Sequence, residues 1–217
     1  MAREIRPLVG DWKLEESAAG VTVYSSERAV VAFAGIGAQR ATLATAAALR
    51  FGSAHLLISA GWAGGLHPEI AAGAAHRVKR VVDGATGEVY ESESFKDDGT
   101  TLVTTGRVAS LAGKKKLREQ YSGDLVDMEA ATVARLARVK DLPFLAVKAV
   151  SDAYDFELPG MEGFITQDGQ FREATFAMYI AVRPHLWKAA SQMGRTSAAA
   201  AEALCRELAT LIAANSG

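Results

Sequence analysis

Three apolar, β-prone runs recur along the chain, and each ends in glycines or in small polar residues. The runs span residues 29–34, 55–60 and 144–150, and the turn residues that follow them are 35–37, 61–65 and 151–152. Short apolar runs bounded in this way are typical of buried strands. Two further runs, 78–82 and 88–95, flank Asp83 and Gly84 and predict a hairpin.

Helical spacing of apolar residues fills several of the intervals between these strands. It predicts helices over 38–50, 129–140, 171–192 and 196–214, the last with Thr196 or Ser197 as its N-cap. Leu204, Leu208, Leu211 and Ile212 form one stripe that we expect to pack on the sheet. Strands that alternate with helices indicate an α/β fold with a largely parallel sheet. No repeat or shift in composition divides the chain, so we expect a single domain over residues 1–217.

Composition narrows the classes of partner. The 217 residues are 49% hydrophobic and 23% charged, and 24 Lys and Arg stand against 25 Asp and Glu for a net charge of -1. This balance excludes the basic surface of a nucleic-acid binder and favours small-molecule chemistry. Cys205 is the single cysteine and is interpreted as a buried core thiol. No run suits a membrane span or a secretory signal, so a cytoplasmic location is expected.

Candidate chemistry lies where the predicted strands end. Glu129 opens a helix and Asp152 leaves a buried strand, although each could instead serve only as a local cap. The glycine turn 35–37 could bring backbone N–H groups close to an anion or a sugar. It lacks the third glycine and the acidic residue of a dinucleotide site, which disfavours a nicotinamide-dependent oxidoreductase. The run 114–116 of three lysines is interpreted as a solvated helix face, with phosphate binding as the lesser alternative.

Four motifs follow one another in a distinctive order. They are Gly35-Ile36-Gly37 with Ala41, then Ala63-Gly64-Gly65-Leu66, then Asp127-Met128-Glu129-Ala130-Ala131, and finally Pro143-Phe144 leading to Lys148-Ala149-Val150-Ser151-Asp152. This order resembles the purine nucleoside phosphorylase and nucleosidase superfamily over residues 30–155. It is most similar to the branch of methylthioadenosine/S-adenosylhomocysteine nucleosidase and futalosine hydrolase, and the tail 168–187 is similar to hopanoid-associated phosphorylases. The resemblance implies a three-layer fold with a mixed, largely parallel central sheet flanked by helices.

The resemblance also implies roles for single residues. Asp152 matches the general acid that protonates N7 of the departing purine, a step worth roughly 10² to 10⁴ in rate. Glu129 matches the carboxylate that accepts hydrogen bonds from the ribose 2′ and 3′ hydroxyls. Met128 matches the residue that packs on the ribose, and Ala63 and Gly64 match the turn beside the sugar and the base.

The first residues resemble the family's helix that carries a water-activating glutamate, with the strand before it missing. Glu4 then matches that glutamate, whereas an ordinary charged residue near the terminus is the plain alternative. The missing strand implies either a longer natural chain or a sheet that tolerates a gap. The usual phosphate-binding positions hold Ser59 and Trp62, although Arg40 or Arg107 could supply a replacement cation.

Base recognition is less defined. The aromatic residue that stacks on adenine in methylthioadenosine nucleosidases has no counterpart near Val108 and Ala109. Val108 is expected to contact the substrate, and Trp62 either lines the pocket or belongs to the core.

Three functions remain open at this point. The first is hydrolysis of the N-glycosidic bond of an adenosine-like nucleoside, which the altered phosphate positions favour. The second is phosphorolysis of the same bond with phosphate as co-substrate, and the third is a nucleoside-binding protein without catalysis. No cofactor, metal or nucleic acid is expected, and the resemblance implies a homodimer.

Overall fold

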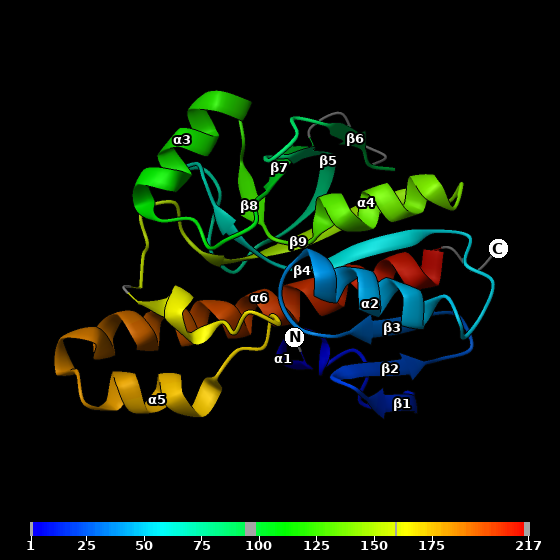
Figure 1. Cartoon of the computed structure of the whole chain (residues 1–217), viewed down its shortest axis with the longest axis horizontal. Coiled ribbons are helices and arrows are strands. Elements are labelled where there is room, and N and C mark those ends of the chain that lie inside the picture. Colours follow the sequence, from blue (N-terminus) through cyan, green and yellow to red (C-terminus); the bar gives the residue numbers. More distant parts are fainter. Residues whose placement is uncertain (1, 94–98, 159, 215–217) are drawn as a thin grey trace.

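The chain folds into strands and helices that alternate over most of its length (Figure 1). The computed structural model describes residues 2–93, 99–158 and 160–214. The first half contains α1 (Ala2–Ile5), β1 (Lys13–Ala18), β2 (Val21–Ser25), β3 (Val30–Phe33), α2 (Ala38–Ala48), β4 (Leu57–Gly65), β5 (Ala75–Asp83), β6 (Val89–Glu91) and β7 (Thr100–Thr104). The second half contains α3 (Leu111–Tyr121), β8 (Leu125–Asp127), α4 (Ala130–Val139), β9 (Phe144–Asp152), the 3-10 turn η1 (Met161–Phe164), α5 (Glu173–Ala181), the 3-10 turn η2 (Pro184–Leu186) and α6 (Trp187–Ala214).

The larger sheet has six strands in the order β6-β5-β7-β8-β4-β9. Strand β5 also pairs with β9, so β5, β7, β8, β4 and β9 close into a ring. Pairs β4–β9, β5–β7 and β7–β8 are parallel, whereas β4–β8, β5–β6 and β5–β9 are antiparallel. Strands β1, β2 and β3 form a separate antiparallel sheet. The prediction of an α/β fold with a mixed central sheet flanked by helices is therefore confirmed.

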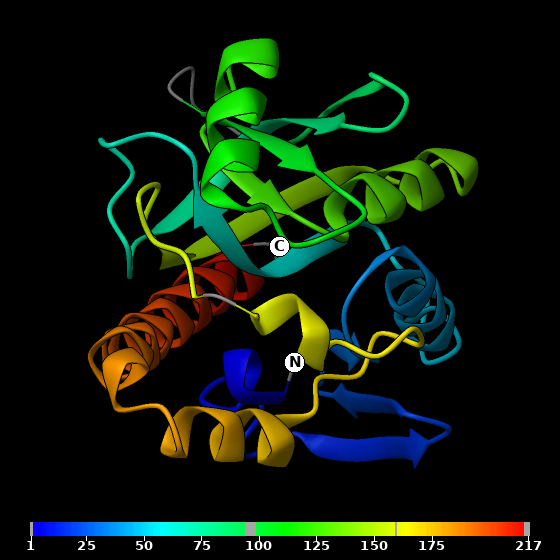
Figure 2. The ribbon, with the colours of Figure 1, turned by 60° about the vertical axis from the view of Figure 1, so that its left-hand side comes forward.

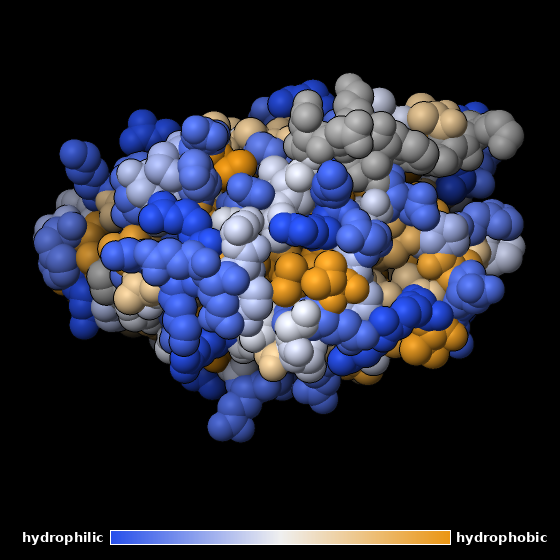
Figure 3. Space-filling view, turned by 90° about the horizontal axis from the view of Figure 1, so that it is seen from above, coloured by the Kyte–Doolittle hydropathy of each residue, from blue (hydrophilic) through white to orange (hydrophobic). Residues whose placement is uncertain are grey.

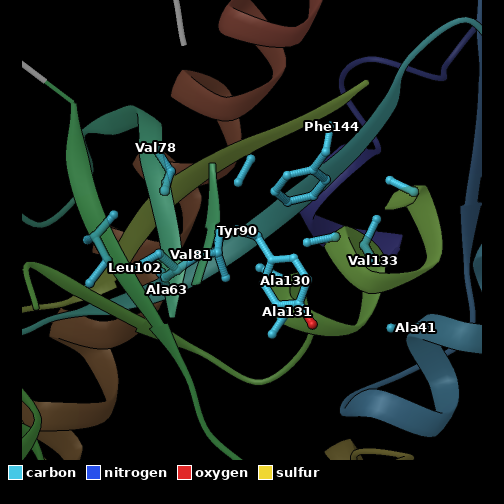
Figure 4. Close-up of a cluster of buried hydrophobic side chains, with 14 of the residues drawn as sticks. Ala41, Ala63, Val78, Val81, Tyr90, Leu102, Ala130, Ala131, Val133 and Phe144 are labelled. Carbon is cyan, nitrogen blue, oxygen red and sulfur yellow. The ribbon is translucent and has the colours of Figure 1, made fainter. Parts of the chain in front are cut away.

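Alternation along β9 divides the core between two helices. Leu145, Val147 and Ala149 face α6, where they meet Ala200, Leu204, Leu208 and Leu211. Phe144, Ala146 and Val150 face the opposite side and join a cluster with α4 (Figure 4). Successive strand residues point to opposite faces, so one apolar strand can support a helix layer on each side. The predicted stripe of leucines on the last helix does pack on the sheet.

Strands β4 and β9 run further than their apolar patterns predict. The sequence placed their ends at residues 60 and 150, whereas the ladder continues to Gly65 and Asp152. Gly64 pairs with Val126 of β8 on one side and with Asp152 of β9 on the other. The glycines of β4 therefore form a strand rather than a turn. This extension brings the end of β9 and the start of α4 to one edge of the sheet.

The C-terminal helices differ from the prediction in where they break. The sequence placed one helix over 171–192 and a second from Thr196, but α5 ends at Ala181 and α6 runs unbroken from Trp187. Pro184 explains the break, because proline lacks the N–H that continues a helix. Gly194 is tolerated inside α6. Thr196 is not an N-cap, since its hydroxyl donates to the Ser151 carbonyl at 2.7 Å.

The face of the molecule seen from above is mostly polar. Figure 3 shows hydrophilic residues over most of one face, with apolar residues exposed only in small separate patches. Among the residues that the structure describes, no helix has the length and apolar character needed to cross a membrane.

Candidate functional site

A cavity of about 1090 Å³ lies between β3 and α2 on one side and β4 on the other. Its walls include α1, the end of α6, the loop 105–109, and the ends of β8 and β9. Met161 and Ile165 also border it, and Figure 2 shows the η1 segment (yellow) between α1 and the larger sheet. Strands β3 and β4 are not paired with each other. Three residues with carboxylate side chains, Glu4, Glu129 and Asp152, line this cavity.

Glu129 stands at the N-cap position of α4, but it does not cap the helix with its side chain. Its Oε1 accepts a hydrogen bond from the Gly37 N–H at 2.6 Å, and its Oε2 accepts one from the Met128 N–H at 3.2 Å. The N–H of Gly37 in the glycine turn is thus used by a carboxyl group of the chain itself, and the approach of this turn to a bound anion or sugar stays a prediction. Burial, followed by the charge of Asp127, raises the pKa of Glu129 to about 7 from the ordinary 4.5, while the charge of Lys148 opposes this shift.

Lys148 is a buried cation within this group of carboxylates. Its Nζ lies 2.9 Å from Oδ2 of Asp127 and donates to Oγ of Ser59 at 3.1 Å. Burial alone would lower the pKa of Lys148, but the charges of Asp127, Glu129 and Glu4 raise it above its ordinary value. The Glu4 side chain reaches the same place, because a Cβ added to Gly61 would lie 3.2 Å from Glu4 Oε2 and 3.9 Å from Lys148 Nζ.

Asp127 supplies the cap that α4 needs. Its Oδ2 accepts the Ala130 N–H at 2.9 Å, and its Oδ1 accepts the Thr104 hydroxyl at 2.6 Å. An Asp side chain that binds a free N–H at a helix start satisfies a donor that the helix cannot pair. Capping therefore belongs to Asp127, and Glu129 is free to face the cavity.

Asp152 lies in a different part of the cavity from Lys148 and its carboxylate partners. Its Oδ2 accepts a hydrogen bond from Lys114 Nζ at 2.5 Å, and its Oδ1 accepts one from the Ser151 hydroxyl at 2.6 Å. The side chain of Asp152 is 26% exposed and that of Lys114 is 4% exposed. The prediction that all three lysines of the run 114–116 are solvated is therefore wrong for Lys114, which lies on the inner side of α3, whereas Lys115 and Lys116 are exposed.

The remaining predicted residues also border the cavity. Met128 and Val108 are half-buried in its wall, and Ala63 and Gly64 line it from β4. Trp62 borders it too, although its side chain packs against the cluster of apolar residues under α6. Asp155, three residues after Asp152, is exposed.

The two arginines that could bind a phosphate, Arg40 and Arg107, each make defined contacts in the structure. The Arg40 guanidinium pairs with the Asp168 carboxylate at 2.8 Å, and its Nε also donates to the Asp168 carbonyl. Arg107 lines the cavity, and its carbonyl accepts the Thr105 hydroxyl at 2.8 Å. Among the described residues, no group of three His, Cys, Asp or Glu side chains is placed to hold a metal ion.

Comparison with known proteins places the chain in a family. The phosphorylase superfamily profile matches residues 15–98 and 93–182, which together cover most of the chain. The chain belongs to the phosphorylase superfamily. The expected superfamily is thereby confirmed, whereas the similarity of the tail 168–187 to hopanoid-associated phosphorylases stays a prediction. No curated protein sequence gives a significant match.

Solved structures of other superfamily members share the fold. The Helicobacter pylori 5′-methylthioadenosine/S-adenosylhomocysteine nucleosidase has a TM-score of 0.71 at 15% identity, covering 98% of this chain and 94% of that chain. The Neisseria meningitidis nucleosidase of the same name, in complex with methylthio-immucillin-A, has a TM-score of 0.69 at 21% identity, covering 96% and 94%. The futalosine hydrolase of Helicobacter pylori has a TM-score of 0.64 at 17% identity, covering 94% and 92%.

Lys114 and Lys148 are the site residues that sequence reasoning missed in this superfamily member. Lys148 interrupts the apolar run 144–150, and a charge inside a buried strand needs a partner, so that signal was present. Lys114 gave no signal, because its two lysine neighbours make the run resemble a solvated helix face.

Proposed function

We propose that the chain hydrolyses the N-glycosidic bond of a purine nucleoside and releases the free base. The observation that carries this proposal is the meeting of Glu4, Glu129 and Asp152 at one cavity, although they come from α1, the start of α4 and the end of β9. Membership of the superfamily supports a reaction at this bond. The volume of the cavity is ample for a nucleoside.

The reaction needs a proton at the base and stabilisation at the sugar. Water bonds to C1′ of the ribose while the bond from C1′ to the purine nitrogen breaks and leaves its electron pair on the base. Asp152 takes up a proton from solvent before the reaction and gives it to N7 of that base, and Glu4 takes a proton from the water. General acid catalysis of this kind contributes roughly 10² to 10⁴ in rate.

Glu129 and the carboxylates near it can bind the ribose and stabilise the positive charge that it gains in the reaction. The ionised carboxylate of Glu129 would accept hydrogen bonds from the ribose hydroxyls, and charged acceptors make such bonds about twice as strong as neutral ones. The sugar gains positive charge as the base departs, and fixed negative charge around it stabilises that state. Asp127, Glu129 and Glu4 place negative charge around Lys148 at this end of the cavity.

The carboxylates near the sugar favour water over phosphate as the nucleophile. A phosphate beside Lys148 would also meet Asp127 and Glu129, and like charges repel strongly at partly buried sites. Arg40 is paired with Asp168, which leaves Arg107 in the cavity wall as the arginine that could bind a phosphate. Phosphorolysis is therefore the weaker alternative.

A base-release assay tests the proposal. The purified protein is incubated with adenosine, methylthioadenosine, adenosylhomocysteine or futalosine, in buffer with and without phosphate, and the free base and the sugar product are measured. We expect release of base and a free reducing sugar at the same rate in both buffers. Strict dependence on phosphate with a sugar 1-phosphate product would establish phosphorolysis instead. Nucleoside binding without release of any base would show a silent binding protein.

A further inference from the structure

The run of three lysines on α3 divides into one buried and two exposed side chains. Lys114 is 3% exposed, whereas Lys115 and Lys116 lie on the outer side of the helix. The helix begins at the Ser110 cap, whose hydroxyl accepts the Gly113 N–H at 3.2 Å. A buried ammonium is costly unless it is paired and hydrogen-bonded. The partners of Lys114 therefore define what this side chain does.

All three N–H groups of the Lys114 ammonium are in use. Nζ donates to Asp152 Oδ2 at 2.5 Å, to the Ala153 carbonyl at 2.6 Å and to the Phe156 carbonyl at 3.2 Å. An ammonium has three donors and no acceptor. No donor is left for a substrate or an anion, so any influence of Lys114 on a reaction passes through Asp152 and the turn that follows it.

The carboxylate of Asp152 is held on both oxygens. Lys114 binds Oδ2 and the Ser151 hydroxyl binds Oδ1, and the same hydroxyl lies 3.3 Å from the Ala63 carbonyl. Gly64 leaves the space for this arrangement, because a Cβ there would lie 3.0 Å from Asp152 Oδ2 and 3.5 Å from Lys114 Cε. Two fixed donors and a missing Cβ set the orientation of a side chain that faces the cavity.

We infer that Lys114 is a positioning residue that holds Asp152 in the orientation needed to protonate the departing base. The inference rests on the proposed function, because it gives Lys114 a role in the acid step of that reaction. As the proton leaves Asp152 a carboxylate forms, and the adjacent ammonium stabilises the charge that develops on it. Without Lys114, both the orientation and this stabilisation are lost.

A double-mutant cycle tests the inference on a cleavable nucleoside. We expect Lys114→Met to lower kcat about 10-fold or more with KM within about threefold, because the base is protonated only in the transition state. The same change in the Asp152→Asn background should have no further effect, because residues that act through one another are not additive. The matched control is Lys116→Met, which removes a charge from the exposed side of the same helix and should leave kcat unchanged.

A second substrate separates positioning from a structural role. A 4-nitrophenyl riboside has a leaving group that departs without protonation, so Lys114→Met should change its cleavage by less than about threefold. Ser151→Ala, which removes the hydrogen bond on Oδ1, should show the same selectivity to a smaller degree and serves as the test if Lys114→Met does not fold.

Three results would overturn the inference. They are unchanged nucleoside cleavage in Lys114→Met, an equal loss on both substrates, and a further loss in the double variant. In each case the unchanged protein still releases base, so the proposed function stands. If the unchanged protein releases base from no nucleoside, the proposed function fails and the inference fails with it.

Discussion

Two buried lysines serve the two ends of the cavity in different ways. Lys148 lies among the carboxylates of Asp127, Glu129 and Glu4. Lys114 pairs with Asp152. On the proposed function, the carboxylates around Lys148 would stabilise a sugar that becomes cationic, whereas the Lys114 ammonium would stabilise the carboxylate that Asp152 becomes once it has given up a proton. Each end of the cavity would then serve one half of the bond cleavage.

The largest expected effect comes from removing Lys148. Its side chain is 2% exposed and that of Asp127 is 0% exposed. Removing one partner of a fully buried pair leaves an uncompensated charge and costs about 3–5 kcal/mol. We therefore expect Lys148→Met to lower the free energy of unfolding by that amount in denaturant titrations. Lys114→Met should cost less, because Asp152 is partly exposed; equal losses would remove the distinction between the two ends.

The next effect concerns the pH dependence set by Glu129. Its folded-state pKa of about 7 lies above the ordinary 4.5. Stability from its protonated form is complete at acidic pH and is lost as the pH rises through about 7. We expect the unfolding free energy to fall by about 1 kcal/mol between pH 6 and pH 8, and Glu129→Gln to abolish that fall. The same ionisation should raise kcat/KM over this range. A flat stability profile in the unchanged protein would contradict the raised pKa.

The smallest effect tests how tightly the position of Asp152 is fixed. Gly64→Ala would press a methyl group against Asp152 Oδ2 and Val126 Cγ1, which lie 3.0 and 3.2 Å from the added Cβ. We expect base release to fall about 10-fold, since small displacements of reacting groups are costly, with less than about 1 kcal/mol lost in stability. Gly163→Ala is the matched control, because nothing lies within 4 Å of a Cβ there. Unchanged activity in Gly64→Ala would show that Asp152 tolerates displacement.

Much of the fold could be predicted from the sequence because apolar runs mark buried strands directly. Strands β3 and β9 and helices α2 and α4 lie within a few residues of the predicted ranges. The short strands β7 and β8 were missed, since five and three residues carry too little pattern. The break between α5 and α6 was misplaced because Thr196 and Ser197 are typical N-cap residues, whereas the helix breaks at Pro184.

The site was predicted in part for a similar reason. Glu129 and Asp152 stand directly after recognisable elements, and the motif order identifies them. Lys114 belongs to the site only because its side chain reaches Asp152 at the end of β9. A run of three lysines does not show which of them the helix buries or what lies next to it in space. Asp127 was quoted within a motif, but its role as the cap of α4 depends on the side-chain geometry.

The most direct test of the account is base release by Asp152→Asn at saturating nucleoside, with nucleoside binding measured in parallel on protein that is shown to be folded. Asparagine keeps the shape of the side chain but has no proton to transfer to N7. We expect the rate to fall by roughly 10² or more, while the dissociation constant changes by no more than a few fold. Turnover near that of the unchanged protein would contradict the assignment of Asp152 as the acid and, with it, the division of the cavity into a sugar end and a base end.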